Sequence, residues 1–223
     1  MNIYDRLKEW HKQHLNLNAT SVYERVHPSE ALAFILPKHY AGRKPSVSYA
    51  FGVRKGIHLV ACVTYGLPAS PSLCRGVMGG SYVDKVIELN RLCRIDEYTE
   101  PLSKLVAYSL RELGKLDNFC VVSYADTAMT HVGYIYQATN FLYTGISAKR
   151  TDVFTGDGKH SRHAKCVEGA PRKNRSSKHR YIIFVGRHRK DMRKHLAYQT
   201  KPYPKGESKK YVLGTFIKDN LVD

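Results

Sequence analysis

The stretch from residue 85 to residue 124 constrains the fold of this chain most, because one well-defined helix lies between two strand-like runs. Residues 100–113 carry apolar or small side chains at the i, i+3, i+4 and i+7 spacing of a single helix face. Pro101 suits the first turn of this helix, and Gly114 suits its end. The runs Lys85–Arg94 and Phe119–Tyr124 are apolar and bounded by turn residues, which is typical of strands. A helix between two strands predicts an α/β fold.

Further elements are predicted on both sides of this unit. Upstream we expect helices at 3–14 and 30–36 and strands at 22–27, 48–54 and 58–65. Downstream we expect a short helix at 131–139 and strands at 141–146 and 181–185. Residues 66–80 are rich in Gly and Pro and are expected to form a long loop, which is often a functional feature. This order of elements predicts a mixed β-sheet flanked by helices.

Basic residues are concentrated in the last third of the chain. The whole chain has 36 Lys and Arg against 19 Asp and Glu, a net charge of +17, and residues 150–223 contribute +12 of it. We therefore predict a core at 1–150 and a basic extension at 151–223 that holds the strand at 181–185. Residues 187–210 offer almost no core side chains. Such a charge favours a polyanionic partner, most often nucleic acid, although a solvated basic face would also keep a protein soluble.

Several classes of protein are excluded or disfavoured. No apolar run approaches the ~20 residues that a membrane-spanning helix needs, so an integral membrane protein is excluded and no membrane partner is expected. The five Cys residues are scattered without a C-x-x-C spacing, which argues against a zinc-finger framework. The N-terminal residues lack the apolar segment of a signal peptide, so we expect a reduced, cytoplasmic protein. The sequence carries no signal for a particular oligomeric state.

The densest group of polar and aromatic residues begins at the end of the predicted strand 119–124. Its members are Ser123, Tyr124, Asp126, His131, Gly133, Tyr136, Gln137, Asn140 and Tyr143. Open α/β sheets bind ligands where strands end. There a buried Asp126 would have a raised pKa and act as a general base, with a nearby tyrosine supplying a proton. The alternative is that Asp126 caps the next helix and Tyr136 is a core aromatic.

Two other positions are candidates for the same cleft. His39-Tyr40 follows the predicted helix 30–36, and Glu88 lies inside an apolar strand, where an unpaired carboxylate is costly. Glu88 therefore needs a partner, which could be an arginine in a structural ion pair, a metal ion or a substrate amine. His39 and Glu88, together with Asp126 and His131, resemble a histidine–carboxylate iron set, so iron is one cofactor to consider.

The basic extension has the composition of a phosphate-contacting surface. Its Lys and Arg residues would bind phosphates, and its Ser and Asn residues would add hydrogen bonds. The predicted DNA-binding residues are Arg162, Arg172, Lys173, Arg175, Lys178, Arg187 and Arg189. Interleaved tyrosines such as Tyr181 and Tyr198 could stack on bases. A flexible, solvated loop remains the alternative.

The segment VVSYADTAMTHVGYIYQATNFLYTG, residues 121–145, resembles the hallmark segment of the bacteriophage Mu Mom family of DNA-modification proteins. Further matching elements are His39-Tyr40 within Lys38–Arg43, the Glu-Leu-x-Arg element at 88–91, Ser103, and the Gly-Lys-x-Ser-Arg element at 158–162. The resemblance runs in order from about residue 21 to residue 185.

The resemblance implies a fold like that of the GCN5-related N-acyltransferases and a reaction on adenine in double-stranded DNA. The N6 amine would acquire a small acyl-type group, described as carbamoylmethyl, which protects phage DNA from restriction in the host cytoplasm. It also implies roles for single residues. Asp126 and Tyr136 would be an acid–base pair, with Ser123 beside them. Arg91 and Ser103 would bind donor or substrate, and His39 and Tyr40 would line the pocket. The residue pattern itself adds Glu88, Tyr124, His131, Asn140 and Tyr143 as candidates for binding substrate or donor.

One segment departs from the acyltransferase pattern. Those enzymes hold the acyl-CoA pyrophosphate with a Gly-rich loop before the main helix, whereas residues 94–101 here contain no Gly and three acidic residues. An acyl-CoA donor in the usual pose is therefore doubtful, and another activated donor or an iron-assisted step stays open. Two other classes of function also stay open: a non-catalytic nucleic-acid-binding protein, and an N-acyltransferase that acts on another amine.

Overall fold

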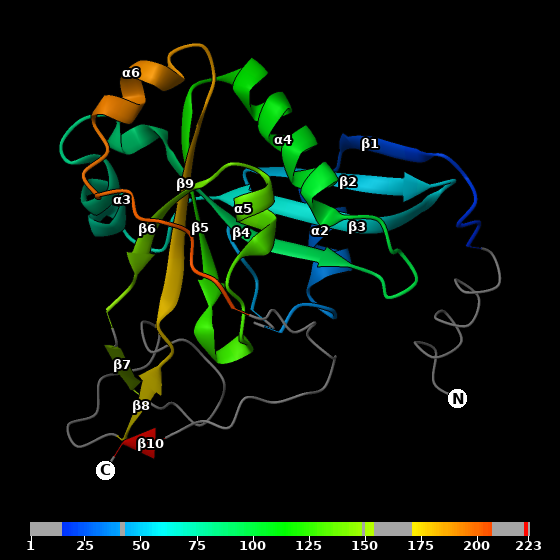
Figure 1. The fold of residues 1–223 in the computed structure, drawn as a ribbon. Coiled ribbons are helices and arrows are strands. Elements are labelled where there is room, and N and C mark those ends of the chain that lie inside the picture. Colours follow the sequence, from blue (N-terminus) through cyan, green and yellow to red (C-terminus); the bar gives the residue numbers. More distant parts are fainter. Residues whose placement is uncertain (1–14, 41–42, 149, 154–170, 207–220, 223) are drawn as a thin grey trace.

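The computed structural model describes residues 15–40, 43–148, 150–153, 171–206 and 221–222. The predicted helix at 3–14 and the element at 158–162, with Arg162, lie outside the described residues. Figure 1 shows one large sheet with helices on both faces. Its seven strands follow the order β1-β2-β3-β4-β5-β9-β6, and β4 and β5 are the one parallel pair of neighbours in the described sheet.

The strands of the large sheet are β1 Ser21–Arg25, β2 Tyr49–Lys55, β3 His58–Gly66, β4 Val86–Arg94, β5 Phe119–Asp126, β6 Leu142–Ile146 and β9 Lys178–Val185. A smaller sheet pairs β10 Leu221–Val222, β8 Arg172–Arg175 and β7 Arg150–Val153. The helices are α2 Pro28–Ile35, α3 Pro71–Met78, α4 Leu102–Leu116, α5 Tyr134–Ala138 and α6 Arg189–Lys194. Short 3₁₀ turns cover Val83–Lys85 and Thr127–Met129. The predicted mixed sheet flanked by helices is confirmed.

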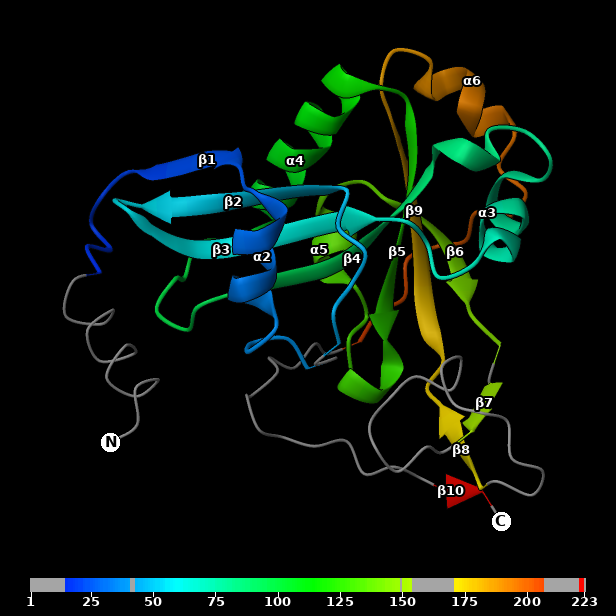
Figure 2. The ribbon, with the colours of Figure 1, turned by 180° about the vertical axis from the view of Figure 1, so that it is seen from behind.

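The alternation of side chains along the strands decides which helix covers which face. The odd-numbered residues of β5 and β9, such as Val121 and Tyr181, join the core beneath α4 and α5. Even-numbered residues, such as Val122 and Ile182, pack against α3 and α6 on the other face. Viewed from behind, α2 also lies on this second face, over β2 and β3 (Figure 2). We call these two sides the α4 face and the α3 face.

The strands β4 and β5 diverge after a short stretch of pairing. They pair from Val86 with Cys120 to Leu89 with Ser123, although β4 continues to Arg94 and β5 to Asp126. The gap between them opens at the middle of the sheet, toward the lower part of Figure 1. A bulge lies at the same place, because Tyr65 of β3 pairs with Leu89 and Thr64 pairs with Arg91, leaving Asn90 as the extra residue.

The bulge changes the direction of the residues that follow it. Ile87 and Leu89 point toward α4, and strict alternation would send Arg91 the same way. The extra residue reverses the alternation, so that Leu92 packs against the α4 core instead and Arg91 joins Glu88 on the α3 face. The bulge therefore supplies a second charged residue to one side of the gap.

Two sequence predictions about helices are wrong. The Gly- and Pro-rich segment 66–80 contains α3, which Ser70 caps by accepting a hydrogen bond from the Leu73 amide at 3.3 Å, with Pro71 in the first turn. The main helix does not end before Gly114 but continues to Leu116. Gly114 instead allows a close approach to β9, since a Cβ there would lie 2.9 Å from the Gly186 nitrogen.

The residues after 150 contribute to the sheet and to its core. β9 is longer than the strand predicted at 181–185, and it lies between β5 and β6 rather than at an edge. Residues 187–210 were expected to offer almost no core side chains, and the fully buried one among the described residues is Met192 of α6, which packs against α3. Among the described residues, no helix is long and apolar enough to span a membrane.

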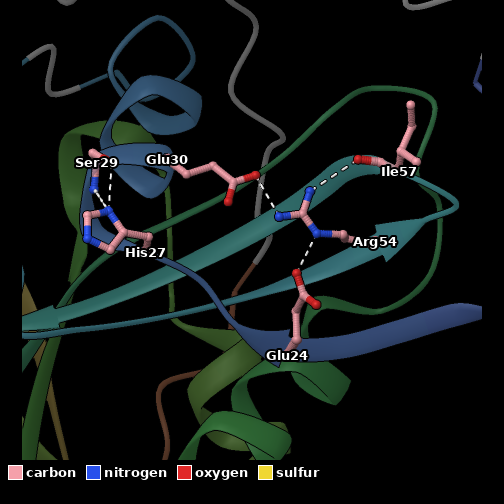
Figure 3. A network of polar contacts seen from close by, with 6 residues as sticks. All are labelled: Glu24, His27, Ser29, Glu30, Arg54 and Ile57. Carbon is pink, nitrogen blue, oxygen red and sulfur yellow. Dashed lines mark hydrogen bonds and ion pairs between the residues drawn. The ribbon is translucent and has the colours of Figure 1, made fainter.

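At the other end of the sheet, one arginine joins three elements (Figure 3). The Arg54 guanidinium on β2 pairs with Glu24 on β1 and, at 2.7 Å, with Glu30 on α2. It also donates to the Ile57 carbonyl oxygen at 3.1 Å, in the turn after β2. These contacts fix α2 and β1 against the sheet far from the gap between β4 and β5.

Candidate functional site

A pocket of about 770 Å³ lies at the gap between β4 and β5. Its walls come from segments far apart in the sequence, including the residues after α2, the start of α3, β4, β5, α5 and β9. Nine of the residues predicted from the sequence line it: His39, Tyr40, Glu88, Arg91, Tyr124, His131, Tyr136, Arg175 and Lys178. The gap in the sheet thus brings together residues that the sequence separates by more than a hundred positions.

The two predicted acid–base residues approach the pocket from opposite faces of the sheet. Asp126 is an even-numbered residue of β5 and lies on the α3 face with Lys178 of β9. Tyr136 belongs to α5 on the α4 face, where it packs against Phe141 and Tyr181. Because β4 and β5 diverge here, the two faces communicate through the pocket.

Asp126 is held as a carboxylate. Its side chain is 7 % exposed, and one oxygen accepts a hydrogen bond from the Lys178 ammonium at 2.5 Å. The other oxygen accepts one from the Ala128 amide at 3.0 Å. Burial alone would raise the pKa of Asp126, but the hydrogen bonds from Lys178 and Ser176 outweigh it, so the pKa is lowered. The predicted raised pKa is therefore wrong, although Asp126 also caps the following turn, as the alternative expected.

Tyr136 is held as a neutral phenol. Burial raises the pKa of its hydroxyl, and a hydrogen bond with Ser123 opposes the shift only in part. Ser123 donates its own proton to the Leu89 carbonyl oxygen at 2.9 Å, where the pairing of β4 and β5 ends. Ser123 thus does not line the pocket itself but positions the Tyr136 hydroxyl beside the gap.

Glu88 is the second pocket carboxyl, and its environment differs from that of Asp126. Burial raises the pKa of Glu88, while the nearby charges of Arg91 and Lys178 and a hydrogen bond from the Ala69 amide oppose the shift. In the part of the chain that the structure describes, Glu88 forms no ion pair within 4 Å. The structural ion pair considered for Glu88 is therefore not formed.

Arg91 projects from the bulge with one nitrogen unused. Its terminal nitrogens donate to the Asn90 carbonyl oxygen at 2.7 Å and to the Arg43 carbonyl oxygen at 3.1 Å. Its Nε is buried and has no hydrogen-bond partner among the described residues. A half-buried guanidinium whose Nε donor is buried and unused fits a pocket that receives an oxygen-bearing group.

Three aromatic rings form one end of the pocket. The His39 and Tyr40 rings are stacked, with centroids 4.4 Å apart, and the His131 ring meets Tyr40 edge-on at 6.4 Å. Burial, then the charges of Arg91 and Lys178, lowers the pKa of His39 to about 3, so its ring is neutral at physiological pH. Burial and the Asp126 charge raise the pKa of Tyr40. The stacked His39–Tyr40 pair therefore gives the pocket an uncharged aromatic surface.

The four residues considered for iron do not form a metal centre. Among the described residues, no group of three or more His, Cys, Asp or Glu side chains is arranged to hold a metal ion. His39 stacks on Tyr40 and Asp126 is bound by Lys178, so neither side chain is directed toward a shared ion. The residues present do not fit an iron site.

Three predicted binding residues lie away from the pocket lining. Ser103 is in the first turn of α4, and Asn140 occupies the turn before β6 with a positive φ of 61°. Tyr143 is buried on the α4 face, where its hydroxyl bonds His179 Nδ1 at 2.9 Å. The structure gives Asn140 a conformational role and Tyr143 a packing role.

The predicted DNA-binding residues fall into two groups. Arg175 and Lys178 line the pocket, and Arg172 and Lys173 belong to β8 beside it. Arg187 and Arg189 lie beyond the other end of β9, where Arg189 is the first residue of α6, at the top of Figure 1. Roughly 23 Å of strand separates Lys178 from Val185, at ~3.3 Å per residue. These cations therefore cannot all surround the pocket.

The sequence reasoning missed one wall of the pocket. The Arg180 guanidinium lies over the Tyr198 ring, 3.3 Å from its centroid, and both residues line the pocket beside Ser70 and Leu73 of the α3 segment. The alternation in KHRYIIFV could have indicated Arg180, because it shares a strand face with Lys178 and with buried Ile182. Tyr198 was predicted only as a tyrosine that could stack on bases, and no sequence pattern placed it beside Arg180 in this pocket.

Comparisons with known proteins agree with the resemblance seen in the motifs. The model of the Mom protein family matches residues 21–205. Methylcarbamoylase mom of Escherichia phage Mu is 24 % identical over 192 residues, covering 78 % of this chain and 80 % of that protein. An N-acetyltransferase from Staphylococcus aureus shows structural similarity to this chain, with 10 % identity, a TM-score of 0.46, and coverage of 74 % and 98 %. So does a GNAT-family acetyltransferase from Bacillus cereus, with 11 % identity, a TM-score of 0.42, and coverage of 76 % and 100 %.

Proposed function

This chain belongs to the Mom protein family, and from that premise we propose that it is a DNA-modifying transferase that places a methylcarbamoyl-type group on the N6 amine of adenine. The modification would protect DNA from restriction enzymes. The group is the one named for the phage Mu relative. Its isomer, the carbamoylmethyl group that the motif resemblance implied, contains the same atoms but is joined to nitrogen through a CH₂ carbon.

The observation that carries the proposal is the composition of the pocket at the gap between β4 and β5. Its lining combines a cluster of aromatic rings, a buried arginine and the carboxyl of Glu88, and Asp126 is held next to it by Lys178. An adenine N6 amine is paired inside duplex DNA, so an enzyme that modifies it must flip the base out and hold it between aromatic or apolar side chains. The stacked His39 and Tyr40 rings and the Arg180–Tyr198 pair offer such surfaces.

Cations on the α3 face supply the approach for DNA. Arg175, Lys178 and Arg180 line the pocket from β8 and β9, and Lys178 and Arg180 point to the same face as Glu88 and Asp126. Phosphate contacts of this kind give most of the sequence-independent affinity for DNA. We therefore infer that DNA approaches the α3 face and that the flipped base enters the gap from there.

Opposite pKa shifts assign the two roles in the transfer. The lowered pKa keeps Asp126 ionised, so it can accept the proton that N6 loses. The raised pKa keeps Tyr136 protonated, so it can donate a proton to the leaving group of the donor. In the balanced step the N6–carbon bond forms, the bond between the carbon and its donor breaks, and the leaving group takes that electron pair.

The donor does not fit the usual acyl-CoA pose. The residues before α4 carry exposed Asp96 and Glu97, and the N-cap residue Pro101 makes no capping hydrogen bond from its side chain. Anionic side chains at a helix N-terminus oppose the binding of a pyrophosphate there. We infer that the donor carries an acyl-type group. If the donor contains coenzyme A, the phosphates of the coenzyme A bind away from this loop.

The direct test is the nucleoside composition of plasmid DNA from cells that express the chain. Wild-type protein should yield a deoxyadenosine heavier by one methylcarbamoyl group in place of a hydrogen. Asp126→Asn and Tyr136→Phe should each lower its amount by about 10²-fold or more, as expected for loss of a general base or acid. Fragmentation of the nucleoside separates the methylcarbamoyl group, a urea, from its carbamoylmethyl isomer.

Matched variants control for folding. Asp117→Asn disrupts another Asp–Lys pair, the 2.7 Å contact with Lys85 at the far end of β5, and Tyr108→Phe removes a hydroxyl outside the pocket. Both should leave the modification unchanged. Unmodified adenine with the wild type would refute the proposed function, and full modification with both pocket variants would refute the assigned roles.

A further inference from the structure

The carboxyl group of Glu88 occupies a position that neither the fold nor the transfer step explains. It lies on the α3 face at the point where β4 and β5 separate, and it lines the pocket. The groups that act on it are Arg91 on β4, Lys178 on β9, Tyr136 on α5 and Cys74 on α3. It forms no ion pair with either cation among the described residues, and the Ala69 amide donates to it. A carboxyl that is buried with one backbone donor still has hydrogen-bonding capacity on its pocket side.

The backbone amide of Ala69 gives this carboxyl group a direction. An amide N–H bonds most favourably to a carbonyl-type oxygen, which leaves the second oxygen to carry the proton when the group is neutral. A neutral Glu88 then presents an acceptor and a donor side by side. Burial raises the pKa of Glu88, which favours this neutral form more than at an exposed glutamate.

Adenine offers the complementary pattern along its Watson–Crick edge. Its N6 amine donates and the neighbouring N1 accepts, and the enzyme reads a flipped base by that edge. Guanine has the reverse order at the same two positions, with an accepting O6 and a donating N1–H. Because Ala69 fixes which oxygen of Glu88 accepts, guanine in the same orientation would oppose acceptor to acceptor and donor to donor.

We propose that Glu88 binds the Watson–Crick edge of the flipped adenine, accepting a hydrogen bond from N6 and donating one to N1. The inference rests on the proposed function and names the residue that recognises its substrate. It leaves the second N6 hydrogen directed at Asp126, on the same face of the sheet. Glu88 thereby orients the amine for the transfer as well as selecting the base.

The test is a binding measurement that needs no donor. The probes are two duplexes that carry either adenine or 1-deazaadenine, which lacks the N1 acceptor, opposite an abasic site, so that little energy is needed to flip the base. Wild-type protein should bind the adenine duplex roughly tenfold more tightly, as expected for one buried hydrogen bond. Glu88→Gln retains an acceptor and a donor in the same places and should keep this preference. Glu88→Ala should abolish the preference, because it removes the donor to N1, and should weaken binding of both duplexes, because both bases keep the N6 amine.

The pH dependence of this preference separates recognition from a structural role. In the wild type the preference should decline as the pH rises and Glu88 loses its proton, whereas in Glu88→Gln it should not change over the same range. Glu97→Gln, an exposed glutamate outside the pocket, is the control and should behave as the wild type. Thermal unfolding of each variant identifies any that fails to fold.

Two outcomes would overturn the inference. The first is that Glu88→Ala keeps the tenfold preference for the adenine duplex over the 1-deazaadenine duplex, and the second is that a folded Glu88→Gln protein loses this preference. The nucleoside analysis of plasmid DNA distinguishes a failure of this inference from a failure of the proposed function. If wild-type protein modifies adenine but Glu88→Ala still prefers it over 1-deazaadenine, the inference alone fails. If no adenine is modified by the wild type, the proposed function fails.

Discussion

The Asp126–Lys178 pair carries the largest consequences of any single contact in the pocket. Both partners lie on one face of adjacent strands, and the carboxylate is almost fully buried. The pair stabilises the ionised form of Asp126, which is the form the proposed reaction needs. The same contact also stabilises the fold, because the pKa of Asp126 is lower in the folded protein than in the unfolded chain.

Replacing the lysine should therefore reduce stability in a pH-dependent way. Lys178→Met should cost about 1–3 kcal/mol at pH 7, since it leaves a buried carboxylate unpaired. A lowered folded-state pKa gives stability that is present above the unfolded value and is lost as the pH falls through the folded value. The difference in the free energy of unfolding between wild type and Lys178→Met, measured with urea, should therefore become smaller at pH values below the ordinary pKa of Asp.

The matched control for this prediction is Lys85→Met. It breaks the more exposed contact with Asp117, so it should cost clearly less than Lys178→Met, because exposed pairs add little to stability. The prediction would be contradicted if Lys178→Met and Lys85→Met lost the same free energy of unfolding, or if the difference between wild type and Lys178→Met did not change with pH. Either result would mean that Lys178 does not stabilise the Asp126 carboxylate.

At the scale of the elements, the entry into α5 decides where Tyr136 points. Gly133 is the N-cap of α5 and has a φ of 81°, a backbone conformation that residues other than Gly rarely adopt. A Cβ at this position would lie 2.5 Å from the Tyr181 ring. Glycine is therefore required at position 133 both by the backbone angle and by the close packing of the Tyr181 ring.

Gly133→Ala should destabilise the protein by about 2–4 kcal/mol, from an unfavourable backbone angle and an overpacked site together. It should also lower adenine modification by shifting α5 and the Tyr136 hydroxyl. Gly79→Ala provides the comparison, because Gly79 has a φ of 63° but no atom within 4 Å of an added Cβ. It should cost only about 1 kcal/mol. Equal costs in thermal unfolding would show that the Tyr181 contact is unimportant.

The sequence predicted the strands and the main helix because their periodicity is strong, as in residues 58–65 and 100–113. It missed α3 because Gly and Pro dominate that segment, and the cap formed by Ser70 is a local signal easily overlooked. The site residues from 121 to 145 were found from the family motif and from their position at a strand end. The bulge at Asn90 and the contact between Arg180 and Tyr198 depend on pairing between distant strands, which no local pattern encodes.

At the scale of the whole molecule, the predicted DNA-binding cations that the structure describes are divided between two ends of β9. Arg175 lies at the pocket end, and Arg187 lies at the end near α6. A duplex that inserts its target base into the pocket and also reaches Arg187 must extend along the length of this strand. That length corresponds to roughly seven base pairs, from strand and duplex rises of ~3.3 and ~3.4 Å.

The separation of Arg175 from Arg187 should be measurable as a difference in how their substitution affects DNA binding. Arg175→Ala should weaken binding to duplex DNA and lower the slope of log K against log salt by about 1, the change expected for one lost phosphate contact. Arg187→Ala should have the same effect only on duplexes that extend at least about seven base pairs beyond the target. Binding titrations with long and short duplexes measure both. An Arg187→Ala defect that is equal on short duplexes would contradict the separation.

The most direct test of the proposed adenine modification is the fragmentation spectrum of the deoxynucleosides from DNA modified by the wild-type protein. The account predicts one additional species whose added mass remains on the adenine base after deoxyribose is lost, and which disappears with Asp126→Asn. An added mass on another base or on the sugar, or DNA that stays unmodified in the presence of folded protein, would contradict it.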